Sequence, residues 1–212
     1  MHIPDSFLPI PQAAVYWLIA LVFIALALRW VRREMSEEKV PLVAVLAAGV
    51  FALQAFNIPV MMGTSGHLLG AALVAIVLGS PFAAVFVLSL VLIVQGVLFG
   101  DGGLTTMGAN IVNMGVIGGF VGYYGYHGLL SLSKSMFASA AGAAWLACFV
   151  PALAAALELT VAGTFPLVPG LIGMGVYHAL IGVVEAVITA VVLGLIVNAR
   201  PDILERAEVT PA

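Results

Sequence analysis

Long apolar runs, separated by short polar or glycine- and proline-containing breaks, make up most of the chain. A transmembrane helix needs roughly 20 apolar residues, and runs of about this kind recur along the sequence. Helices are predicted over residues 13–31, 40–60, 66–80, 82–99, 108–126, 137–162 and 171–197. The pattern therefore predicts an all-α integral membrane protein with seven transmembrane helices, in a single transmembrane domain over residues 1–212.

The composition supports a membrane protein and argues against other classes. Of the 212 residues, 63% are hydrophobic and 8% are charged, whereas about a quarter are charged in ordinary soluble domains. A net charge of -3 with seven basic residues gives no electrostatic footprint for nucleic acid. The single cysteine, Cys148, lies in an apolar run and is expected to be a small buried side chain. No secretory leader is expected, so Met1 is interpreted as the mature amino terminus.

The third predicted helix is too short to cross the membrane by itself. From His67 to Gly79 there are only 13 residues, so the glycine-rich stretch Met61–Gly66 must also lie at membrane depth. Non-helical backbone is tolerated there only where it lines a cavity or is buried in protein. This stretch is the first indication of a functional site.

The basic residues indicate an orientation. They follow the first, fifth and seventh predicted spans: Arg29, Arg32, Arg33, Lys39, Lys134, Arg200 and Arg206. The positive-inside rule then places the amino terminus outside and the carboxyl terminus in the cytoplasm. The outer side carries no Lys or Arg in this arrangement, while Asp5 and Asp101 are acidic and would attract a cation.

The first two residues form a potential chelate. The α-amine of Met1, the amide nitrogen of His2 and the His2 Nδ1 can close fused five- and six-membered rings around one metal ion. A fourth nitrogen in the same plane would complete a site of the kind that selects Ni(II) or Cu(II), and His67 is the candidate. A chance histidine at position two and a hydrogen-bonded interfacial His67 are the alternative interpretation.

Several motifs resemble the CbiM/NikM family, the substrate-binding components of energy-coupling-factor-type nickel and cobalt transporters. They extend over most of the chain: Met1-His2-Ile3-Pro4-Asp5, Asn57-Ile58-Pro59, Gly63 to Leu73, Gln95 to Thr105, Gly108-Ala109-Asn110, Asn113-Met114-Gly115, His178 to Gly182, and Glu185. One departure is Ser6, where the family usually has glycine.

The resemblance implies a function for the chain. It implies seven helices, a multi-pass location in the cell (inner) membrane, and Ni(II) or Co(II) as the transported substrate. It also implies that the amino-terminal segment is inserted into an outward-facing pocket, where the metal would be held by the Met1 amine, the amide and imidazole nitrogens of His2, and the His67 imidazole. The implied partners are a transmembrane coupling protein, two ATPase subunits that hydrolyse ATP, and a small accessory membrane protein. The chain itself is then not an enzyme. Ile3-Pro4-Asp5 resembles the nickel branch, since methionine and glutamate are expected at positions four and five of the cobalt branch.

Other polar residues have less defined roles. Five residues are expected around the ligands, with Thr64 and Ser65 mainly shaping the loop: Asp5, Asn57, Thr64, Ser65 and Asn110. Asp5 is expected either to bond an imidazole or to serve as a turn residue before the first span. Three ionisable residues inside predicted spans, which can be structural or line an ion path, are Glu158, His178 and Glu185.

Two other functions compete with metal uptake by such a component. Gly63 to Gly70 also fits the GxSGxxxG pattern of rhomboid-type intramembrane proteases, with Ser65 as nucleophile and His178 as base. The glycine after His178 stands four residues on, where three are expected, and such a protease has no need of Met1-His2. A proton-coupled secondary metal transporter that uses Glu158 or Glu185 is the other alternative. No lysine lies in a GxxxxGK[ST] phosphate loop, so energy must come from a partner or an ion gradient.

Overall fold

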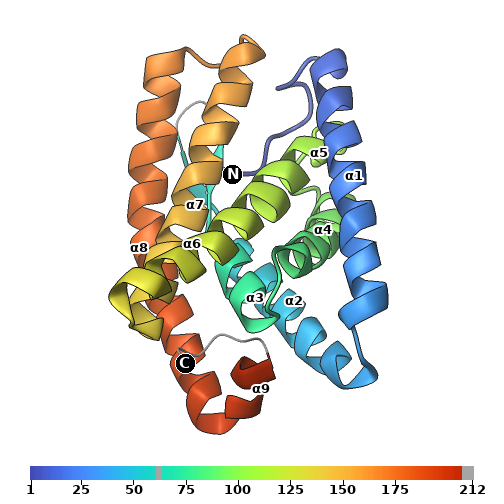
Figure 1. Cartoon of the computed structure of the whole chain (residues 1–212). Coiled ribbons are helices and arrows are strands. Elements are labelled where there is room, and N and C mark those ends of the chain that lie inside the picture. The colour runs from blue at the N-terminus through green and yellow to red at the C-terminus, as the bar shows by residue number, and fades with distance from the viewer. Residues whose placement is uncertain (61–63, 207–212) are drawn as a thin grey trace.

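The computed structural model describes residues 1–60 and 64–206, and these residues are almost entirely helical (Figure 1). The elements in chain order are α1 (Ile10–Glu34), the 3-10 helix η1 (Glu37–Lys39), α2 (Val40–Gln54), β1 (Ile58–Pro59), β2 (Ser65–Gly66), α3 (Ala71–Val77), α4 (Pro81–Leu98), α5 (Met107–Asn110), the π-helix η3 (Ile111–Ile117), α6 (Gly118–Ser133), α7 (Met136–Val161), α8 (Leu167–Ala199) and α9 (Pro201–Arg206). Within this part of the chain, α1, α4, α7 and α8 are long and apolar enough to cross a membrane.

These four helices coincide with the predicted runs 13–31, 82–99, 137–162 and 171–197. Their ends follow local sequence signals. The hydroxyl of Ser80 accepts a hydrogen bond from the Phe82 amide (3.2 Å) directly before Pro81, the first residue of α4. Ser135 accepts one from the Ala138 amide (3.3 Å) at the start of α7. Capping residues and proline at the first helical position explain why these boundaries are close to prediction.

The run predicted over residues 108–126 is helical but not uniform. It consists of α5, η3 and α6 in direct succession, so residues 107–133 form one helical stretch with a π-helical centre. π-Helical turns inside longer helices are rare and occur frequently at functional sites. Here the irregular part begins one residue after Asn110.

The predicted helices over 40–60 and 66–80 are wrong in extent. Helix α2 ends at Gln54, because Ile58 and Pro59 instead pair antiparallel with Gly66 and Ser65. Helix α3 has seven residues and every one of them is buried. Since α3 touches protein on all sides, it does not need the length of a lipid-exposed span. Of the expected dip Met61–Gly66, Met61–Gly63 lie outside the described residues.

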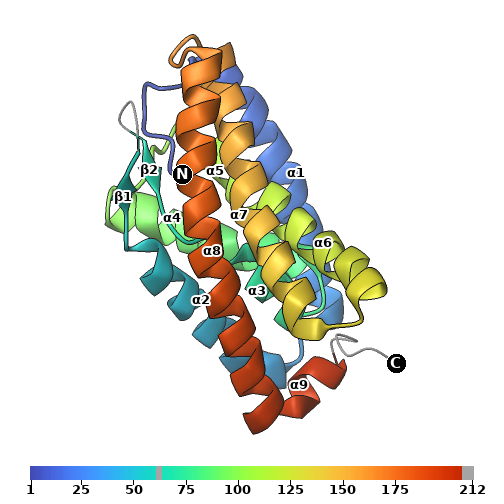
Figure 2. The same cartoon turned by 90° about the vertical axis from the view of Figure 1, so that its left-hand side faces the viewer.

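Helix α3 lies at the centre of the molecule. It packs against α4, α6 and α7, while α7 and α8 form a hairpin (Figure 2). Small residues allow these close approaches. A side chain at Gly122 on α6 would lie 2.6 Å from the Cα atom of Ala72, so only glycine lets α6 approach α3 this closely. Neighbouring alanines on α7 are also fully buried, and their small side chains let the adjacent helices pack closely.

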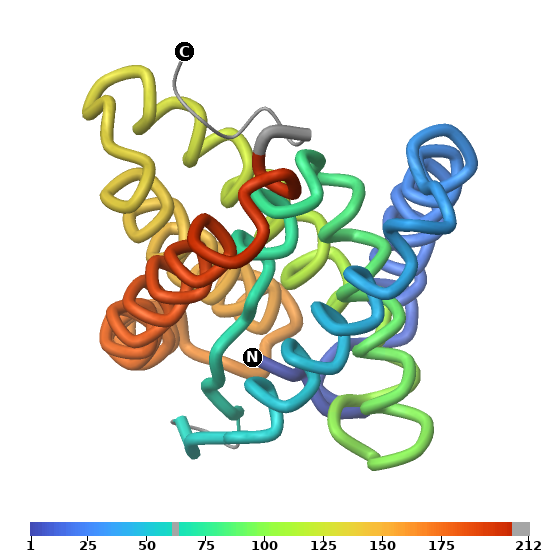
Figure 3. The backbone as a smooth tube through the Cα atoms, turned by 90° about the horizontal axis from the view of Figure 1, so that it is seen from below, coloured from blue at the N-terminus to red at the C-terminus, as the bar shows by residue number. Residues whose placement is uncertain are grey.

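The amino-terminal segment enters the space between the helices. Met1 and Ile3 are each only 1% exposed, although they precede the first helix. Figures 1 and 2 show the terminus inside the bundle and beside the β1–β2 pair. Figure 3, a view from below, shows it between α8 on one side and α1 and α2 on the other. The fold therefore brings the first residues of the chain next to the segment that follows β2.

Candidate metal centre

Ile3 anchors the amino-terminal segment to helix α5. Its amide donates to Oδ1 of Asn110 (2.8 Å), and Nδ2 of Asn110 donates back to the Ile3 carbonyl (3.2 Å). The same carbonyl accepts from the Thr106 hydroxyl (2.5 Å) and the Gly103 amide (3.0 Å). These contacts fix the residue directly after His2, so the main chain of the proposed chelate has a defined position.

Asp5 adds a second anchor at the outer end of the segment. Its carboxylate accepts hydrogen bonds from the amides of Leu104 (3.2 Å) and Thr105 (2.8 Å) and from the Thr105 hydroxyl (2.5 Å). These bonds stabilise the charged form and lower the pKa of Asp5. Asp5 lies in the turn closed by the hydrogen bond from the Phe7 amide to the Pro4 carbonyl (3.4 Å), and its carboxylate binds the loop before α5. Ser6 adopts a left-handed φ of 71°, a conformation that glycine can adopt without strain.

The Met1 amine is buried against the β1–β2 segment. It donates to the main-chain carbonyl of Ser65, whose hydroxyl oxygen lies 3.4 Å from the same nitrogen. Burial lowers the pKa of this amine to about 5 and that of the neighbouring His2 to about 4. Both groups are therefore neutral at pH 7, and neutral amine and imidazole nitrogens are the forms that bind metals.

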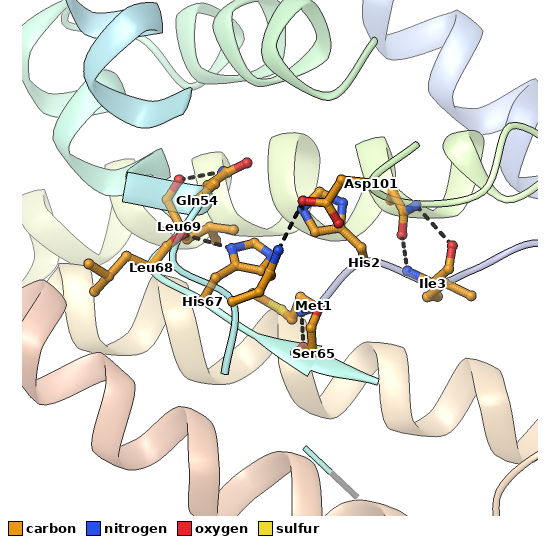
Figure 4. Close-up of polar contacts among 11 residues, drawn as sticks. Met1, His2, Ile3, Gln54, Ser65, His67, Leu68, Leu69 and Asp101 are labelled. Atoms are coloured by element: carbon orange, nitrogen blue, oxygen red, sulfur yellow. Dashed lines mark hydrogen bonds and ion pairs between the residues drawn. The ribbon is translucent and has the colours of Figure 1, made fainter. Parts of the chain in front are cut away.

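Two imidazoles face each other beside the amine (Figure 4). The ring centroids of His2 and His67 lie 4.6 Å apart with an angle of 34° between the planes. His67 Nδ1 lies 2.8 Å from the carbonyl oxygen of Leu68. Because a carbonyl only accepts, Nδ1 carries the proton and Nε2 keeps its lone pair. Within the described residues, His67 Nε2 and both His2 ring nitrogens are buried without a hydrogen-bond partner.

The Asp101 carboxylate contacts the His2 ring. Its Oδ2 atom is 3.7 Å from His2 Nε2 and accepts a hydrogen bond from Asn57 Nδ2 (3.0 Å). The sequence identified Asp101 only as an acidic residue on the outer side. Asp101 lies in the sequence Gly100-Asp101-Gly102-Gly103, and a loop so rich in glycine can approach another chain segment closely. This was the sequence signal that could have placed Asp101 near the site.

A cavity of about 690 Å³ borders His2. Four of the five residues expected around the ligands line it, and the fifth, Asn110, instead holds the main chain of Ile3. The lining includes His2, Asp5, Asn57, Thr64, Ser65 and Asp101. Thr64 donates to the Met174 sulfur on α8 (3.6 Å). The expected residues therefore gather around one cavity, although they contact different partners.

The protease geometry is not formed. Ser65 Oγ lies beside the Met1 amine, whereas His178 Nδ1 lies 2.8 Å from the Met174 carbonyl oxygen, and His178 Nε2 has no partner among the described residues. No hydrogen bond therefore joins Ser65 to His178. The rhomboid-type alternative lacks its serine–histidine pair.

The buried carboxylates are also engaged by the protein. Glu158 accepts from Asn113 Nδ2 (2.7 Å), and Glu185 accepts from the amides of Leu69 and Gly70. Across residues 1–60 and 64–206, no three His, Cys, Asp or Glu side chains gather as a metal cluster. A metal site in this part of the molecule therefore depends on main-chain nitrogens as well as imidazoles.

The comparisons with known proteins agree on one family. The family model described as "Cobalt uptake substrate-specific transmembrane region" (CbiM) matches residues 2–203. A "Putative fused nickel transport protein NikMN" of Archaeoglobus fulgidus is 36% identical over 97% of this chain and 68% of its own length. A "Putative cobalt transport protein CbiM" of Halobacterium salinarum is 35% identical over 99% of this chain and 100% of its own length.

A solved structure gives the same result. The chain described as "Crystal Structure of an Truncated Transition metal Transporter" superposes with a TM-score of 0.88 at 35% identity, over 93% of this chain and 99% of that one. The protein is thus a multi-pass integral membrane transport protein and not an enzyme. It belongs to the CbiM/NikM family, the substrate-specific transmembrane components of energy-coupling-factor systems that take up cobalt and nickel.

Proposed function

We propose that this chain captures one divalent transition metal ion from the outer side, with Ni(II) favoured over Co(II). The supporting observation is that Met1, His2 and His67 are all buried, that the two imidazole rings lie side by side, and that His67 Nε2 and both His2 ring nitrogens have no hydrogen-bond partner among the described residues. The proposed ligands are four nitrogens: the Met1 amine, the His2 amide, His2 Nδ1 and His67 Nε2. Three of them are held by two consecutive residues, and the fourth comes from a ring 4.6 Å away, centroid to centroid. Ligands preset in this way lose little entropy on binding the metal.

The donor set favours nickel on chemical grounds. Fused chelate rings that contain a main-chain amide nitrogen are flat, and planar nitrogen surroundings suit Ni(II) and Cu(II), whereas Zn(II) is usually tetrahedral. Affinity for a given nitrogen site also rises from Co(II) to Ni(II). The Ile3-Pro4-Asp5 continuation supports the same choice. Named relatives include both nickel and cobalt transport proteins.

The proposed topology has seven membrane crossings, with the amino terminus outside and the carboxyl terminus in the cytoplasm. The cavity beside His2 then opens outward, and Asp5 and Asp101 line it. No lysine or arginine falls on the outer side in this arrangement. An approaching cation would meet a negative rim before it reaches the nitrogens.

We further propose that ATP-hydrolysing partners supply the energy. The chain has no GxxxxGK[ST] phosphate loop, and one relative is named as a fused transport protein. The proposed partners are a transmembrane coupling protein, two ATPase subunits and a small accessory membrane protein. Reconstitution with and without them would show whether the chain alone moves metal.

The test of the site is Ni(II) titration of purified protein that begins at Met1. We expect about one Ni(II) per chain with nitrogen-only coordination by X-ray absorption. A formyl group retained on Met1 converts the amine into an amide without adding a new amine, and should abolish this binding. His67→Ala should weaken it by about 100-fold or more, since a direct ligand should cost more than a supporting residue.

Ser65→Ala is the matched control for these variants. The Met1 amine donates to the main-chain carbonyl of Ser65, which this substitution retains, so affinity should stay near that of the wild type. Full affinity in the formylated protein would contradict the chelate model. Competition between Ni(II) and Co(II) on the same sample tests the proposed preference, and stronger binding of Co(II) would contradict it.

A further inference from the structure

The stretch Leu68–Gly70, the His67 turn, is held from two sides inside the bundle. The two carboxylate oxygens of Glu185 on α8 accept the amides of Leu69 (2.6 Å) and Gly70 (2.7 Å). Nε2 of Gln54, the last residue of α2, donates to the Leu69 carbonyl (2.9 Å). Glu185 is 3% exposed, and Gln54 and Leu69 are fully buried. Burial of a carboxylate is costly unless it is hydrogen-bonded, and these two short bonds meet that need.

One peptide group connects this carboxylate to the histidine. The amide N–H of Leu69 and the carbonyl of Leu68 belong to the same planar, trans peptide group, so they point in opposite directions. The N–H faces Glu185 Oε2, and the carbonyl oxygen lies 2.8 Å from His67 Nδ1. The resulting chain of contacts runs from the Glu185 carboxylate through the 68–69 peptide group to His67, which would present Nε2 to the metal.

We propose that Glu185 is a positioning residue that sets the orientation and tautomer of His67 through the 68–69 peptide group. This inference rests on the proposed role of His67 Nε2 as a metal ligand. With the peptide in its observed orientation, Nδ1 must donate to the carbonyl and Nε2 keeps a lone pair. A flipped peptide would direct an N–H toward Nδ1, move the proton to Nε2 and remove the metal-binding nitrogen.

The neighbouring contacts oppose such a flip. The next peptide group, between Leu69 and Gly70, is also held at both ends, by Gln54 at its carbonyl and by Glu185 at its N–H. Gly70 has a φ of 76°, which glycine adopts without strain at the residue before α3. Two successive peptide planes are therefore fixed by side chains from α2 and α8. Ligating histidines commonly donate their other nitrogen to such a fixed acceptor.

The experiment compares Glu185→Leu and Glu185→Gln with the wild type, in full-length protein that begins at Met1. Leucine removes both acceptor oxygens. Glutamine keeps the size but has one neutral carbonyl oxygen and one NH2 group, so one of the Leu69 and Gly70 amides keeps a weaker acceptor and the other faces a donor. Glu158→Gln is the matched control, because Glu158 is also a buried carboxylate but accepts from Asn113 and not from the His67 turn. Thermal unfolding is recorded for each variant.

Two measurements report on Ni(II) affinity and on the His67 ring. Ni(II) affinity is measured by titration, and Cu(II)-loaded samples are studied by electron spin-echo envelope modulation, which detects the imidazole nitrogen that does not bind the metal. The His67 contribution is identified as the signal lost in His67→Ala. We expect Glu185→Leu to weaken Ni(II) binding by about 10- to 100-fold and to shift the quadrupole coupling of this nitrogen. Glu185→Gln should cause a smaller shift, and Glu158→Gln none.

The outcomes separate this inference from the proposed function. Wild-type binding of Ni(II) that depends on His67, combined with unchanged affinity and coupling in both Glu185 variants, overturns the positioning role alone. If Glu185→Leu does not fold, the same criterion applies to Glu185→Gln. A wild-type chain that binds no Ni(II), or binds it independently of His67, overturns the proposed function and this inference together.

Discussion

At the residue scale, two glycines in one loop differ in a way that can test the His2 ligand. Gly100 and Gly102 both have left-handed backbones, with φ of 67° and 91°. An added Cβ at Gly102 would lie 3.0 Å from His2 Nδ1 and 3.1 Å from Asn110 Nδ2, whereas one at Gly100 meets nothing within 4 Å. Alanine therefore strains the backbone at both positions, but only at Gly102 does it press on His2 Nδ1, the proposed ligand.

Gly102→Ala should weaken Ni(II) binding by about tenfold or more, because it displaces His2 Nδ1 from its place. Gly100→Ala should cost about 1–2 kcal/mol of stability for the left-handed backbone and leave the affinity unchanged. Titration of both variants, with thermal unfolding in parallel, checks this pair. Equal affinities in the two variants would contradict the assignment of Nδ1 as a ligand.

The contrast between His67 and Glu185 illustrates what single residues reveal in a sequence. His2 and His67 are identifiable because their chemistry and their place in a motif point to a metal. The link between Glu185 and the His67 turn joins residues 116 positions apart, to Leu69, and 115 apart, to Gly70. The Asp101 contact with His2 joins residues that are 99 positions apart. Such contacts depend on how the helices pack, which no local pattern specifies.

At the scale of elements, the amino-terminal segment depends on its contact with the loop before α5. Asp5 binds Leu104 and Thr105 there, and these bonds hold its pKa below the ordinary value of 3.8. A pKa lowered on folding means that the contact stabilises the folded protein above pH 3.8 and that this contribution is lost as the pH falls through the folded pKa.

Thermal unfolding of metal-free protein should therefore show a difference between wild type and Asp5→Asn that is constant above about pH 5 and shrinks as the pH falls below the ordinary pKa. Asn cannot supply the charged acceptor that the two amides and the Thr105 hydroxyl now share. A difference that stays constant down to the acid limit of folding would indicate that Asp5 acts through its shape and not through its charge.

Helix prediction failed where the environment of an apolar run mattered. Hydropathy located α1, α4, α7 and α8 to within a few residues, because each is one long apolar run with clear end signals. It could not distinguish lipid from protein as the surroundings of α3, and it assigned 66–80 a longer helix than Ala71–Val77. It also missed the pairing of Ile58 with Gly66, which ends α2 early. Both errors fall in the segment that surrounds His67.

At the scale of the whole molecule, the proposed metal site and the basic helix ends lie apart. Figure 1 shows the amino terminus inside the bundle, with the ends of α1 and α8 and the whole of α9 at the opposite, lower end. Arg29, Arg32 and Arg33 are near the end of α1, and Arg200 follows α8. This separation agrees with the charge pattern used to propose the orientation, and it makes the orientation testable by labelling.

The native background suits cysteine labelling, because Cys148 is fully buried. Leu104 is 53% exposed in the loop beside Asp5, and Ser36 and Ser131 are exposed after α1 and near the end of α6. In intact cells, a membrane-impermeant maleimide should label Leu104→Cys alone. Ser36→Cys and Ser131→Cys should react only after the cells are permeabilised, because the positive-inside rule places both in the cytoplasm.

The pair Ser36 and Ser131 also decides how many times the chain crosses the membrane. Between these residues the seven-span arrangement has four crossings, one of which must be made by the stretch from β2 through the seven-residue α3. An even number returns the chain to the same side. If Ser131→Cys is labelled from outside while Ser36→Cys is protected, the stretch from β2 through α3 does not cross the membrane. His67 would then lie in a re-entrant segment that enters from the outer side and returns to it.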